Sequence, residues 1–328
     1  MLLGIGLIAL VLLDVFWTTL WVEGGAGPLA SRLIAWTWRG WRRLVGEDRH
    51  RALSLAGPLA LILVTQAWAA MLWGGWALVF AADEGAMTSA SHARPFGWSD
   101  RLYFAGYTVF TLGIGDFTPA RGGWQLLTVL AVASGLVVAT LAVTYLLSLV
   151  SAVVQARSLA GQVAGLGASA EDLVLLGWDG EGFGALELPF HAIATQLGAI
   201  THQHQAYPAL HYYHASSARN AHVLAVAAFD EALTLLTHGV QESVRPAAAV
   251  LRPARSAVDS FLETLKAGSA AAETPPPPDL ARLRAAGIPT VSDEAFAAAL
   301  QAEAERRRAL SRMLRSDARS WPADMAAG

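Results

Sequence analysis

The sequence contains no cysteine, and Lys266 is the only lysine among its 23 basic residues. Without cysteine the chain has no disulfide, no thiolate metal site and no cysteine nucleophile. Charged side chains make up 15% of the residues, whereas an ordinary soluble protein has about 25%. The formal net charge of −3 excludes a nucleic-acid binder that relies on a strongly basic surface. We therefore expect no nucleic-acid partner.

Apolar residues are concentrated in three long runs. Residues 2–22 contain a single charge, Asp14, and residues 55–82 and 124–154 contain none. About 20 consecutive apolar residues are enough for a helix to cross the hydrocarbon layer of a membrane. The runs therefore predict a multi-pass protein of the plasma membrane, which in a bacterium is the inner membrane.

The distribution of charge predicts the orientation of the chain. Residues 24–54 carry six arginines and two acids, whereas residues 83–123 carry three arginines and four acids. Since short basic loops stay cytoplasmic, we place the N-terminus outside and residues 24–54 and 157–328 inside. Residues 1–23 have no basic segment before their apolar run, so we interpret them as a retained membrane helix and not as a cleaved signal peptide.

The basic loop contains an amphipathic pattern over residues 28–45. Pro28 favours a helix start, and tryptophans alternate with the arginines Arg39, Arg42 and Arg43. Tryptophan and arginine are typical of helices that lie in the headgroup layer. We predict a helix on the inner leaflet whose arginines contact anionic lipid; a solvated connector is the alternative.

A half-length helix is predicted between the second and third apolar runs, over residues 100–110. Ser99 is a favourable N-cap, and Asp100 adds negative charge at the positive end of the helix dipole. The helix would be about 16 Å long, half the thickness of a bilayer. The hexapeptide Thr-Leu-Gly-Ile-Gly-Asp follows directly, at residues 111–116.

This arrangement resembles the pore-loop family of potassium channels, in which the hexapeptide is usually Thr-Val-Gly-Tyr-Gly-Asp. The resemblance covers residues 55–156: outer helix 55–82, pore helix 100–110, filter 111–116 and inner helix 124–156. It implies an all-α membrane protein that forms a homotetramer, because one filter segment per chain cannot close a ring. The implied activity is passive, single-file conduction of potassium, gated by movement of the inner helix.

The resemblance also assigns the ion-binding residues. Backbone carbonyls of the filter would replace the hydration shell of potassium ions, and the segment consists of Thr111, Leu112, Gly113, Ile114 and Gly115. Carbonyls that point the same way require alternating backbone handedness, and the two glycines adopt positive φ without steric cost. Potassium ions in the filter are the only cofactor expected, and no organic cofactor is predicted.

Two positions in this region differ from the usual family pattern. Ile114 replaces the tyrosine whose hydroxyl normally braces the filter. Tyr107 lies four residues before the filter, where some family members have a glutamate that pairs with the filter aspartate. We predict that Tyr107 and Asp116 support the filter through a hydrogen bond; plain packing of Tyr107 is the alternative.

The inner helix carries a glycine and a polar stripe. Gly135 lies 19 residues after Asp116, where the family commonly has a hinge glycine; the alternative is that it allows close helix packing. The stripe lines the inner cavity or caps carbonyls within the bundle, and it consists of Thr140, Thr144, Ser148 and Ser151. The apolar runs lack regularly spaced arginines, so no voltage sensor is predicted.

Asp14 is the one acidic residue of the first apolar run. An ionisable group inside a membrane is by default a functional candidate. Since Asp14 lies near the inner end of its helix, it can instead pair with an arginine of the basic loop. Both interpretations stay open at this stage.

The cytoplasmic half, residues 157–328, is predicted to be an α-helical domain. Helical patterns cover residues 185–206, 219–240, 246–267 and 293–316, the last with a strong start at Ser292. Glycines at 161, 165 and 167 indicate a flexible linker, and the proline-rich stretch 268–279 indicates a stiff, disordered spacer. Residues 173–178 resemble a first strand of a nucleotide-binding domain, but the glycine pattern after them does not fit and no further strands follow.

Six of the nine histidines fall within residues 191–222. A transition metal is one possible ligand of this region, and the candidate residues are His202, His204, His211 and His214. One alternative is that these histidines pack in the protein interior with their ring nitrogens hydrogen-bonded. The other is a proton sensor, because histidine titrates near neutral pH.

The sequence thus predicts a potassium-selective channel with a helical cytoplasmic domain whose ligand is unknown. It shows no arrangement of a nucleophile, so no enzyme is expected. Two alternatives are kept: a weakly selective cation channel, and a membrane sensor that retains the pore architecture without conducting.

Overall fold

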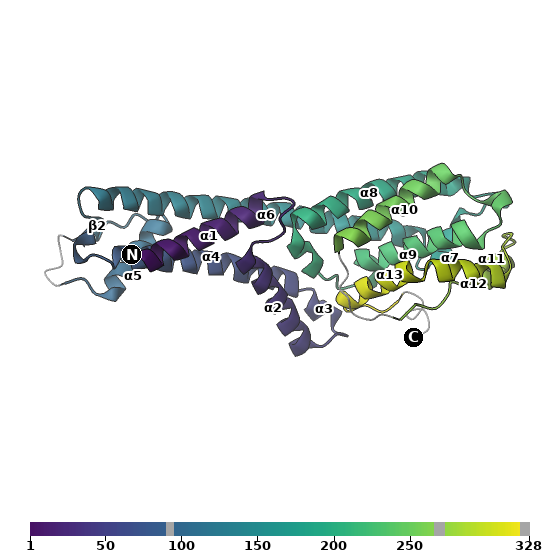
Figure 1. The fold of residues 1–328 in the computed structure, drawn as a ribbon, viewed down its shortest axis with the longest axis horizontal. Helices are drawn as coiled ribbons and strands as arrows, with labels where there is room; N and C mark the ends of the chain where they lie inside the picture. Colours follow the sequence, from purple (N-terminus) through teal and green to yellow (C-terminus); the bar gives the residue numbers. More distant parts are fainter. Residues whose placement is uncertain (90–94, 266–272, 322–328) are drawn as a thin grey trace. The chain divides into compact units, whose positions relative to one another are not determined.

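The computed structural model describes residues 1–89, 95–265 and 273–321. The chain forms two compact units, each largely helical (Figure 1). The first unit consists of Met1–Gly40, Gly57–Val150 and Ala206–Ala209. The second consists of Trp41–Ala56, Ser151–Gln205 and Leu210–Gly328.

The first unit contains the predicted membrane-spanning helices. They are α1 (Leu2–Leu20), α4 (Ala56–Phe80) and α6 (Gly123–Leu166), of which the last continues into the second unit. The described chain has three helical stretches that are long and apolar enough to cross a membrane, and they contain these three helices. The short helix α3 (His50–Leu53) precedes α4.

The linker predicted at the glycines after residue 156 is wrong, because α6 runs on to Leu166. A single glycine costs a helix only about 1 kcal/mol relative to alanine. Leu159 and Val163 are buried in the hydrophobic core of the second unit. Burial of this apolar face outweighs the weak helix propensity of Gly161 and Gly165.

Helices α1 and α4 approach each other closely at a pair of glycines. A Cβ atom on Gly4 would lie 2.6 Å from the carbonyl oxygen of Gly75, and a Cβ on Gly75 would lie 2.7 Å from the side chain of Ile8. Small residues at a helix crossing allow this kind of backbone contact between membrane helices. Figure 1 shows α1 running alongside α4.

Asp14 is fully buried and connects three elements. Its carboxylate accepts hydrogen bonds from the backbone N–H of Leu29 at 2.7 Å and of Ala30 at 3.2 Å, in the first turn of α2 (Pro28–Val45). It also accepts one from Nε1 of Trp68 in α4 at 2.8 Å. The ion pair with an arginine, one of the two open interpretations, is therefore wrong: the carboxylate caps the positive end of α2 from a neighbouring helix.

Two further tryptophans of α4 extend this pattern of hydrogen bonds. Nε1 of Trp73 donates to the carbonyl oxygen of Leu102 in α5 (Trp98–Val109) at 2.8 Å, and Nε1 of Trp76 donates to Oγ of Ser134 in α6 at 2.9 Å. Together with the bond from Trp68, these bonds join α4 to α1, α5 and α6. A two-stranded antiparallel pairing that was not predicted completes this unit, and it joins β1 (Met87–Thr88) to β2 (Thr118–Pro119).

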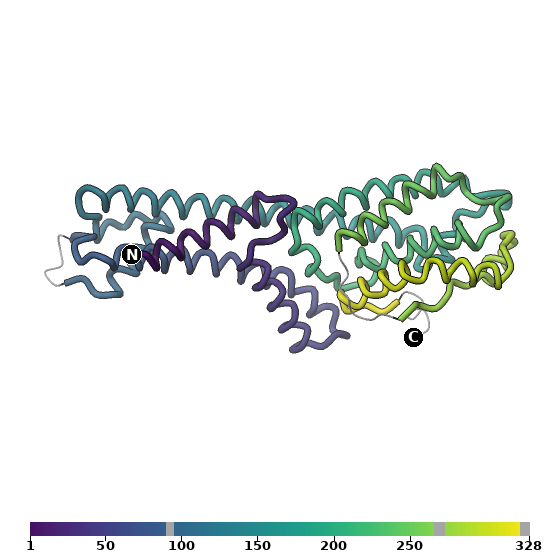
Figure 2. The backbone as a smooth tube through the Cα atoms, in the orientation of Figure 1, coloured from purple at the N-terminus to yellow at the C-terminus, as the bar shows by residue number. Residues whose placement is uncertain are grey.

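The second unit is a helical domain, as predicted (Figure 2). Its α-helices besides α3 and the end of α6 are α7 (Ala170–Gly177), α8 (Glu187–Ala206), α9 (His222–Thr234), α10 (Ala248–Leu265), α11 (Leu280–Ala285), α12 (Asp293–Ala302) and α13 (Ala304–Ser316). A π-helical turn, Leu235–Gly239, extends α9. Short 3-10 turns in the chain are Glu84–Ala86, Gly184–Leu186, Pro208–Tyr212, Ala218–Asn220 and Glu242–Val244.

Two local predictions concern where helices form in this unit. Residues 173–178, which look like a strand in sequence, belong mostly to α7, whose N-cap Ser169 accepts a hydrogen bond from the backbone N–H of Asp172. Strand pairing in the second unit is restricted, within the described residues, to one bridge between Val240 and Thr290. The predicted start at Ser292 is confirmed, because Ser292 caps the backbone N–H of Ala295 at 3.2 Å.

Helix α9 is the centre of this unit. Every residue from Val223 to Thr234 is buried, and α9 packs against α7, α10 and α13. Asp230 pairs with Arg255 at 2.7 Å and with Arg306 at 2.6 Å. Removing one partner of a buried ion pair is strongly destabilising, because a buried charge is left uncompensated.

The proline-rich stretch is held by the second buried acid of α9. Arg307 pairs with Glu231 at 2.7 Å and donates to the carbonyl oxygens of Pro275 and Pro276 at 3.1 and 2.6 Å. The predicted disorder is therefore wrong for residues 273–279. The remainder of the predicted spacer, residues 268–272, lies outside the described residues.

Candidate functional site

Helix α5 has the predicted half-membrane length, but its start differs from the prediction. The helix begins at Trp98, so Gly97 and not Ser99 is the N-cap. The carboxylate of Asp100 accepts a hydrogen bond from the backbone N–H of Gly97 at 2.8 Å. The negative charge in the first turn is confirmed, and it compensates the exposed N–H groups of the helix end.

A buried arginine that the sequence analysis missed ties α5 to the end of α4. Arg101 is 7% exposed, and its guanidinium donates to the carbonyl oxygens of Phe80 and Asp83, the latter at 3.0 Å. These carbonyls lie at and just beyond the C-terminus of α4, where helical hydrogen bonding ends. The available signal was a single arginine, directly after Asp100, in a short helix whose other positions are mostly apolar.

The hexapeptide at residues 111–116 has the backbone alternation that was predicted. Gly113 and Gly115 have φ angles of +62° and +87°. Thr111 also has a positive φ, +57°, which the sequence did not indicate. A non-glycine residue in this region costs about 1–2 kcal/mol, so the surrounding structure must hold Thr111 in place. One such restraint is the hydrogen bond from the N–H of Leu112 to the carbonyl oxygen of Tyr107, at 2.8 Å.

The hexapeptide is exposed in the single chain. All residues from Thr111 to Asp116 are exposed, including the apolar side chains of Leu112 and Ile114, at 67% and 49%. A Cβ on Gly113 would meet no atom within 4 Å. Irregular backbone at membrane depth is tolerated only where protein buries it or where it lines water. One copy of the chain does not bury this segment.

Two tyrosines of α5 hold the residues that end the hexapeptide. The hydroxyl of Tyr107 donates to the carbonyl oxygen of Phe117, not to Asp116 as predicted. Asp116 instead accepts a hydrogen bond from the hydroxyl of Tyr103 at 3.0 Å. Since Tyr103 precedes Tyr107 by four residues, the two side chains share a helix face, and each reaches a different residue. The rings also pack together, with centroids 5.2 Å apart.

Gly135 lies where α6 crosses the C-terminal end of α5. A Cβ atom there would overlap the carbonyl oxygen of Val109, and it would lie 3.2 Å from the side chain of Val109. The structure thus shows close packing of Gly135 against the end of α5, and the hinge stays a prediction. Helix α6 runs continuously through this position.

The polar stripe of α6 makes the carbonyl-capping bonds that were one of its two interpretations. Thr140 donates to the carbonyl oxygen of Leu136 at 2.8 Å, and Thr144 donates to that of Thr140 at 2.9 Å. Both threonines are exposed and Ser148 is partly exposed in the single chain. Their face is therefore not covered within one copy.

The histidines predicted as metal ligands do not come together. Within the described residues, no group of three or more His, Cys, Asp or Glu side chains is arranged to hold a metal ion. His202 is exposed and contacts Gln205. His204 is buried, with Nδ1 3.0 Å from the carbonyl oxygen of Ile200 and its ring 5.3 Å from that of Phe261.

The other two histidines have separate environments. His211 packs against Tyr212, with ring centroids 5.2 Å apart. His214 is 1% exposed, and its Nδ1 lies 3.1 Å from Oδ1 of Asp317 while its Nε2 lies 3.1 Å from Nδ1 of His50.

Burial lowers the pKa of His204 to about 3. His204 is therefore neutral near pH 7, and the packing alternative fits it.

The arginines predicted to contact lipid lie on the helix that was predicted, α2. Arg39 and Arg43 are exposed. Arg42 pairs with Glu47 at 2.7 Å and donates to the carbonyl oxygen of Arg315 at 3.2 Å. The structure therefore separates Arg42, which binds protein groups, from the two exposed arginines.

Comparison with known proteins places this geometry in a family. Residues 67–152, which include α5, the hexapeptide and most of the membrane part of α6, match the protein family described as "Ion channel". The uncharacterized membrane protein YdjJ of Bacillus subtilis is 39% identical over 321 residues, which cover 97% of this chain and 94% of YdjJ. The chain belongs to the YdjJ family. No solved structure matches it.

The family assignment carries three conclusions. The chain is a membrane protein with helices that can span the bilayer. It contains an ion-channel domain of the pore-loop kind. The match of residues 67–152 to the ion-channel family points to a channel and not to an enzyme.

Proposed function

We propose that this member of the YdjJ family is a homotetrameric, potassium-selective channel of the bacterial inner membrane. Four copies of the hexapeptide would form a selectivity filter in which the carbonyls of residues 111–115 replace the water around potassium. The observation that carries the proposal is the alternation of positive φ at Thr111, Gly113 and Gly115 directly after a half-length helix. Few other functions require, inside a membrane, a row of backbone carbonyls that point the same way and are separated by glycines.

Exposure of the hexapeptide supports the tetramer. Leu112 and Ile114 expose most or half of their side chains in one copy, although the segment lies between helices that can span a membrane. Three further copies around a common axis would bury the outer side of the segment and leave its carbonyls facing ions and water. The exposed face of Thr140 and Thr144 would then line the cavity below the filter.

The geometry of α5 supports conduction of a cation. Its C-terminal end at Val109 carries the negative end of the helix dipole, and it lies against Gly135. In the tetramer four such ends would lower the energy of a cation in the cavity. Movement of α6 about Gly135 is the proposed gate. Arg39 and Arg43 are the proposed contacts with anionic lipid.

A weakly selective cation channel is the second candidate, and one observation favours it. Ile114 is 49% exposed and has no hydroxyl with which to brace the filter. Against it stand the two tyrosine bonds, from Tyr107 to Phe117 and from Tyr103 to Asp116, which restrain the outer end of the filter. These bonds favour the selective channel.

Potassium flux from liposomes that contain the purified full chain tests the proposal. Wild-type protein should release potassium, and Gly113→Ala should abolish the flux, because an alanine at φ +62° is strained. Gly6→Ala is the matched control: this glycine lies in α1, and an added Cβ meets nothing within 4 Å. Native mass spectrometry should report four copies. Intact wild-type tetramers without flux would support a non-conducting membrane sensor and contradict the proposal.

A further inference from the structure

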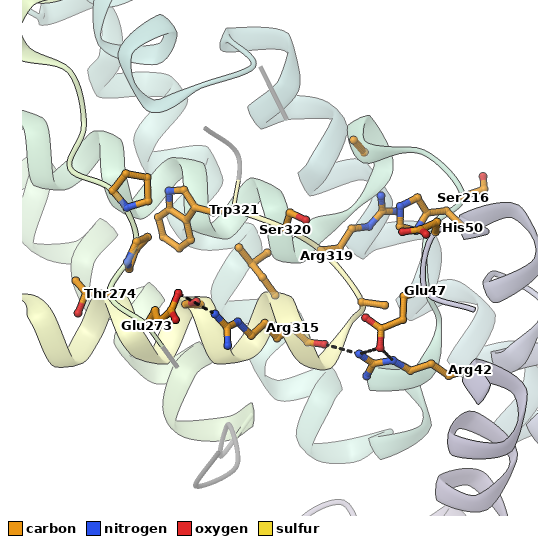
Figure 3. A pocket seen from close by; sticks show the side chains of 17 residues that line it. Arg42, Glu47, His50, Ser216, Glu273, Thr274, Arg315, Arg319, Ser320 and Trp321 are labelled. Carbon is orange, nitrogen blue, oxygen red and sulfur yellow. Dashed lines mark hydrogen bonds and ion pairs between the residues drawn. The ribbon is translucent and has the colours of Figure 1, made fainter. Parts of the chain in front are cut away.

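The second unit contains a cavity of 810 Å³ that the proposed channel function does not use. Residues 273–276 form part of its wall, and two further stretches of the chain form most of the remainder (Figure 3). One is the stretch from Arg42 to His50, at the end of α2 and the start of α3; the other is the stretch from Ser311 to Trp321, at the end of α13 and beyond it. The volume lies within the usual range of small-molecule sites.

Arg319 is the unusual residue of this cavity. It is 6% exposed, and one of its terminal guanidinium nitrogens donates to the carbonyl oxygen of Ala215. Its Nε is buried and has no hydrogen-bond partner. Within the described part of the chain, no carboxylate lies within 4 Å of its guanidinium, unlike those of Arg306 and Arg307. Burial lowers the pKa of Arg319.

None of the other charged groups of the wall, which include Asp48, forms an ion pair within 4 Å of this guanidinium. Arg42 pairs with Glu47, and Arg315 lies 3.9 Å from the exposed carboxylate of Glu273. Asp317, the carboxylate that acts electrostatically on Arg319, has its Oδ1 bound to His214. A buried charge without a hydrogen-bonded counter-ion is costly. An anion in the cavity would supply the missing partner, since guanidinium groups bind carboxylates and phosphates with paired N–H donors.

We propose that this cavity binds an oxyanion, a phosphate or carboxylate group, with Arg319 as its principal cationic contact. The oxyanion comes either from a small soluble molecule or from the headgroup of a phospholipid. In Figure 3 the side chain of Arg319 extends from the C-terminal stretch toward His50, which lies on the opposite wall. The site shares no residue with the proposed filter or with the polar stripe of α6, and its existence does not depend on potassium conduction.

The position of the cavity gives the ligand a regulatory role. The stretch from Arg42 to His50 leads directly into α4 in the chain, and α4 holds α5 through Trp73. The same two walls are already joined by the hydrogen-bond chain from His50 through His214 to Asp317. A bound anion adds a second connection between them. Ligand binding should therefore change the mobility of the segment that precedes the outer helix.

Thermal unfolding of the full chain in nanodiscs tests the site without measuring conduction. Inorganic phosphate and adenosine monophosphate serve as soluble probes in nanodiscs of phosphatidylcholine alone. The lipid source is tested in nanodiscs with equal amounts of phosphatidylcholine and phosphatidylglycerol. A probe that fills the site should raise the unfolding temperature of the wild-type protein by mass action. The source of the oxyanion is whichever probe gives this shift.

Two variants show whether the shift belongs to Arg319. Arg319→Met removes the buried charge, so it should abolish the ligand-dependent shift and leave the ligand-free protein at least as stable as the wild type. Arg308→Met is the matched control: Arg308 lies on α13, pairs with exposed Glu305 and does not line the cavity. The control should keep the wild-type shift.

Three results would overturn the proposal. One is the absence of a shift with any of the three probes. Another is an equal shift in the wild type and in Arg319→Met. The third is a large loss of ligand-free stability in Arg319→Met, which would show that the bond to Ala215 makes Arg319 a purely structural residue.

Discussion

The hydroxyl of Tyr107 donates a hydrogen bond to the backbone carbonyl of Phe117. This bond connects the last turn of α5 to the first residue after the hexapeptide, so it spans the segment that we propose as the filter. Phe117 is buried, and its carbonyl oxygen is held inside the protein instead of facing water. The rigidity of the proposed filter therefore depends on a side chain from the helix behind it.

Tyr107→Phe should weaken the outer end of the filter. The variant leaves the ring in place and removes a buried hydrogen bond, which costs about 1–3 kcal/mol when the partner stays unsatisfied. We expect lower potassium-over-sodium selectivity and faster loss of current, measured in planar bilayers. Tyr103→Phe is the control and should have a smaller effect, because its partner Asp116 is exposed. Equal behaviour of both variants and wild type would contradict the role of Tyr107.

Asp14 and Trp68 should be energetically coupled. Asp14→Asn weakens the cap of α2, and Trp68→Phe removes the indole donor while it leaves that cap intact. In a double-mutant cycle of unfolding free energies, we expect a coupling of about 0.5–3 kcal/mol, the range for residues in one hydrogen-bond network. The measurement is denaturant unfolding in detergent. Additive single effects would show that the carboxylate and the indole act independently.

Gly135→Ala separates packing from hinging. The added methyl group would overlap the carbonyl of Val109, so we expect a lower unfolding temperature as well as reduced flux. Gly161→Ala lies on the same helix with nothing within 4 Å of the added atom, and it should be neutral or stabilising by up to about 1 kcal/mol. Reduced flux in Gly135→Ala at unchanged or raised stability would assign the residue to the hinge alone.

Acid should destabilise the chain through His204. Burial holds the pKa of His204 at about 3, below its ordinary value of 6.5. The unfolded chain therefore binds a proton below pH 6.5 that the folded chain does not, and stability falls as the pH decreases toward 3. The free energy of unfolding falls by about 1.4 kcal/mol per pH unit between pH 6.5 and 3. It is measured by denaturant unfolding between neutral pH and pH 4.5.

Two histidine variants test this origin of the pH dependence. His204→Phe should lower the slope of the unfolding free energy against pH by the equivalent of about one proton. The substitution fits the site because the neighbouring ring of Phe261 marks an apolar environment. His202→Gln changes an exposed residue two positions earlier and should leave the slope unchanged. A wild-type slope in His204→Phe would place the titrating groups elsewhere.

The periodic parts of the structure could be predicted from the sequence. Long apolar runs with at most one charge predicted α1, α4 and the membrane part of α6 within a few residues, because only a helix satisfies its backbone in lipid. The positive φ at Gly113 and Gly115 followed from the requirement for same-way carbonyls. Both predictions depend on what the backbone of a short segment requires, and the residue types of that segment show this requirement directly.

Side-chain pairings were not predictable in the same way. Tyr103 and Tyr107 lie one turn apart, and the sequence does not show which of them reaches Asp116. His211 and His214 are three residues apart, but only a helix would place them on one face. His211 lies in a 3-10 turn that ends at Tyr212, so the two rings point into different surroundings.

The reversal potential of purified tetramers in a planar bilayer tests the central claim most directly. With equal concentrations of potassium on one side and sodium on the other, a carbonyl filter built from residues 111–115 predicts a reversal potential that strongly favours potassium. A value near zero millivolts would show that the pore does not distinguish the two ions, and it would contradict a potassium-selective filter.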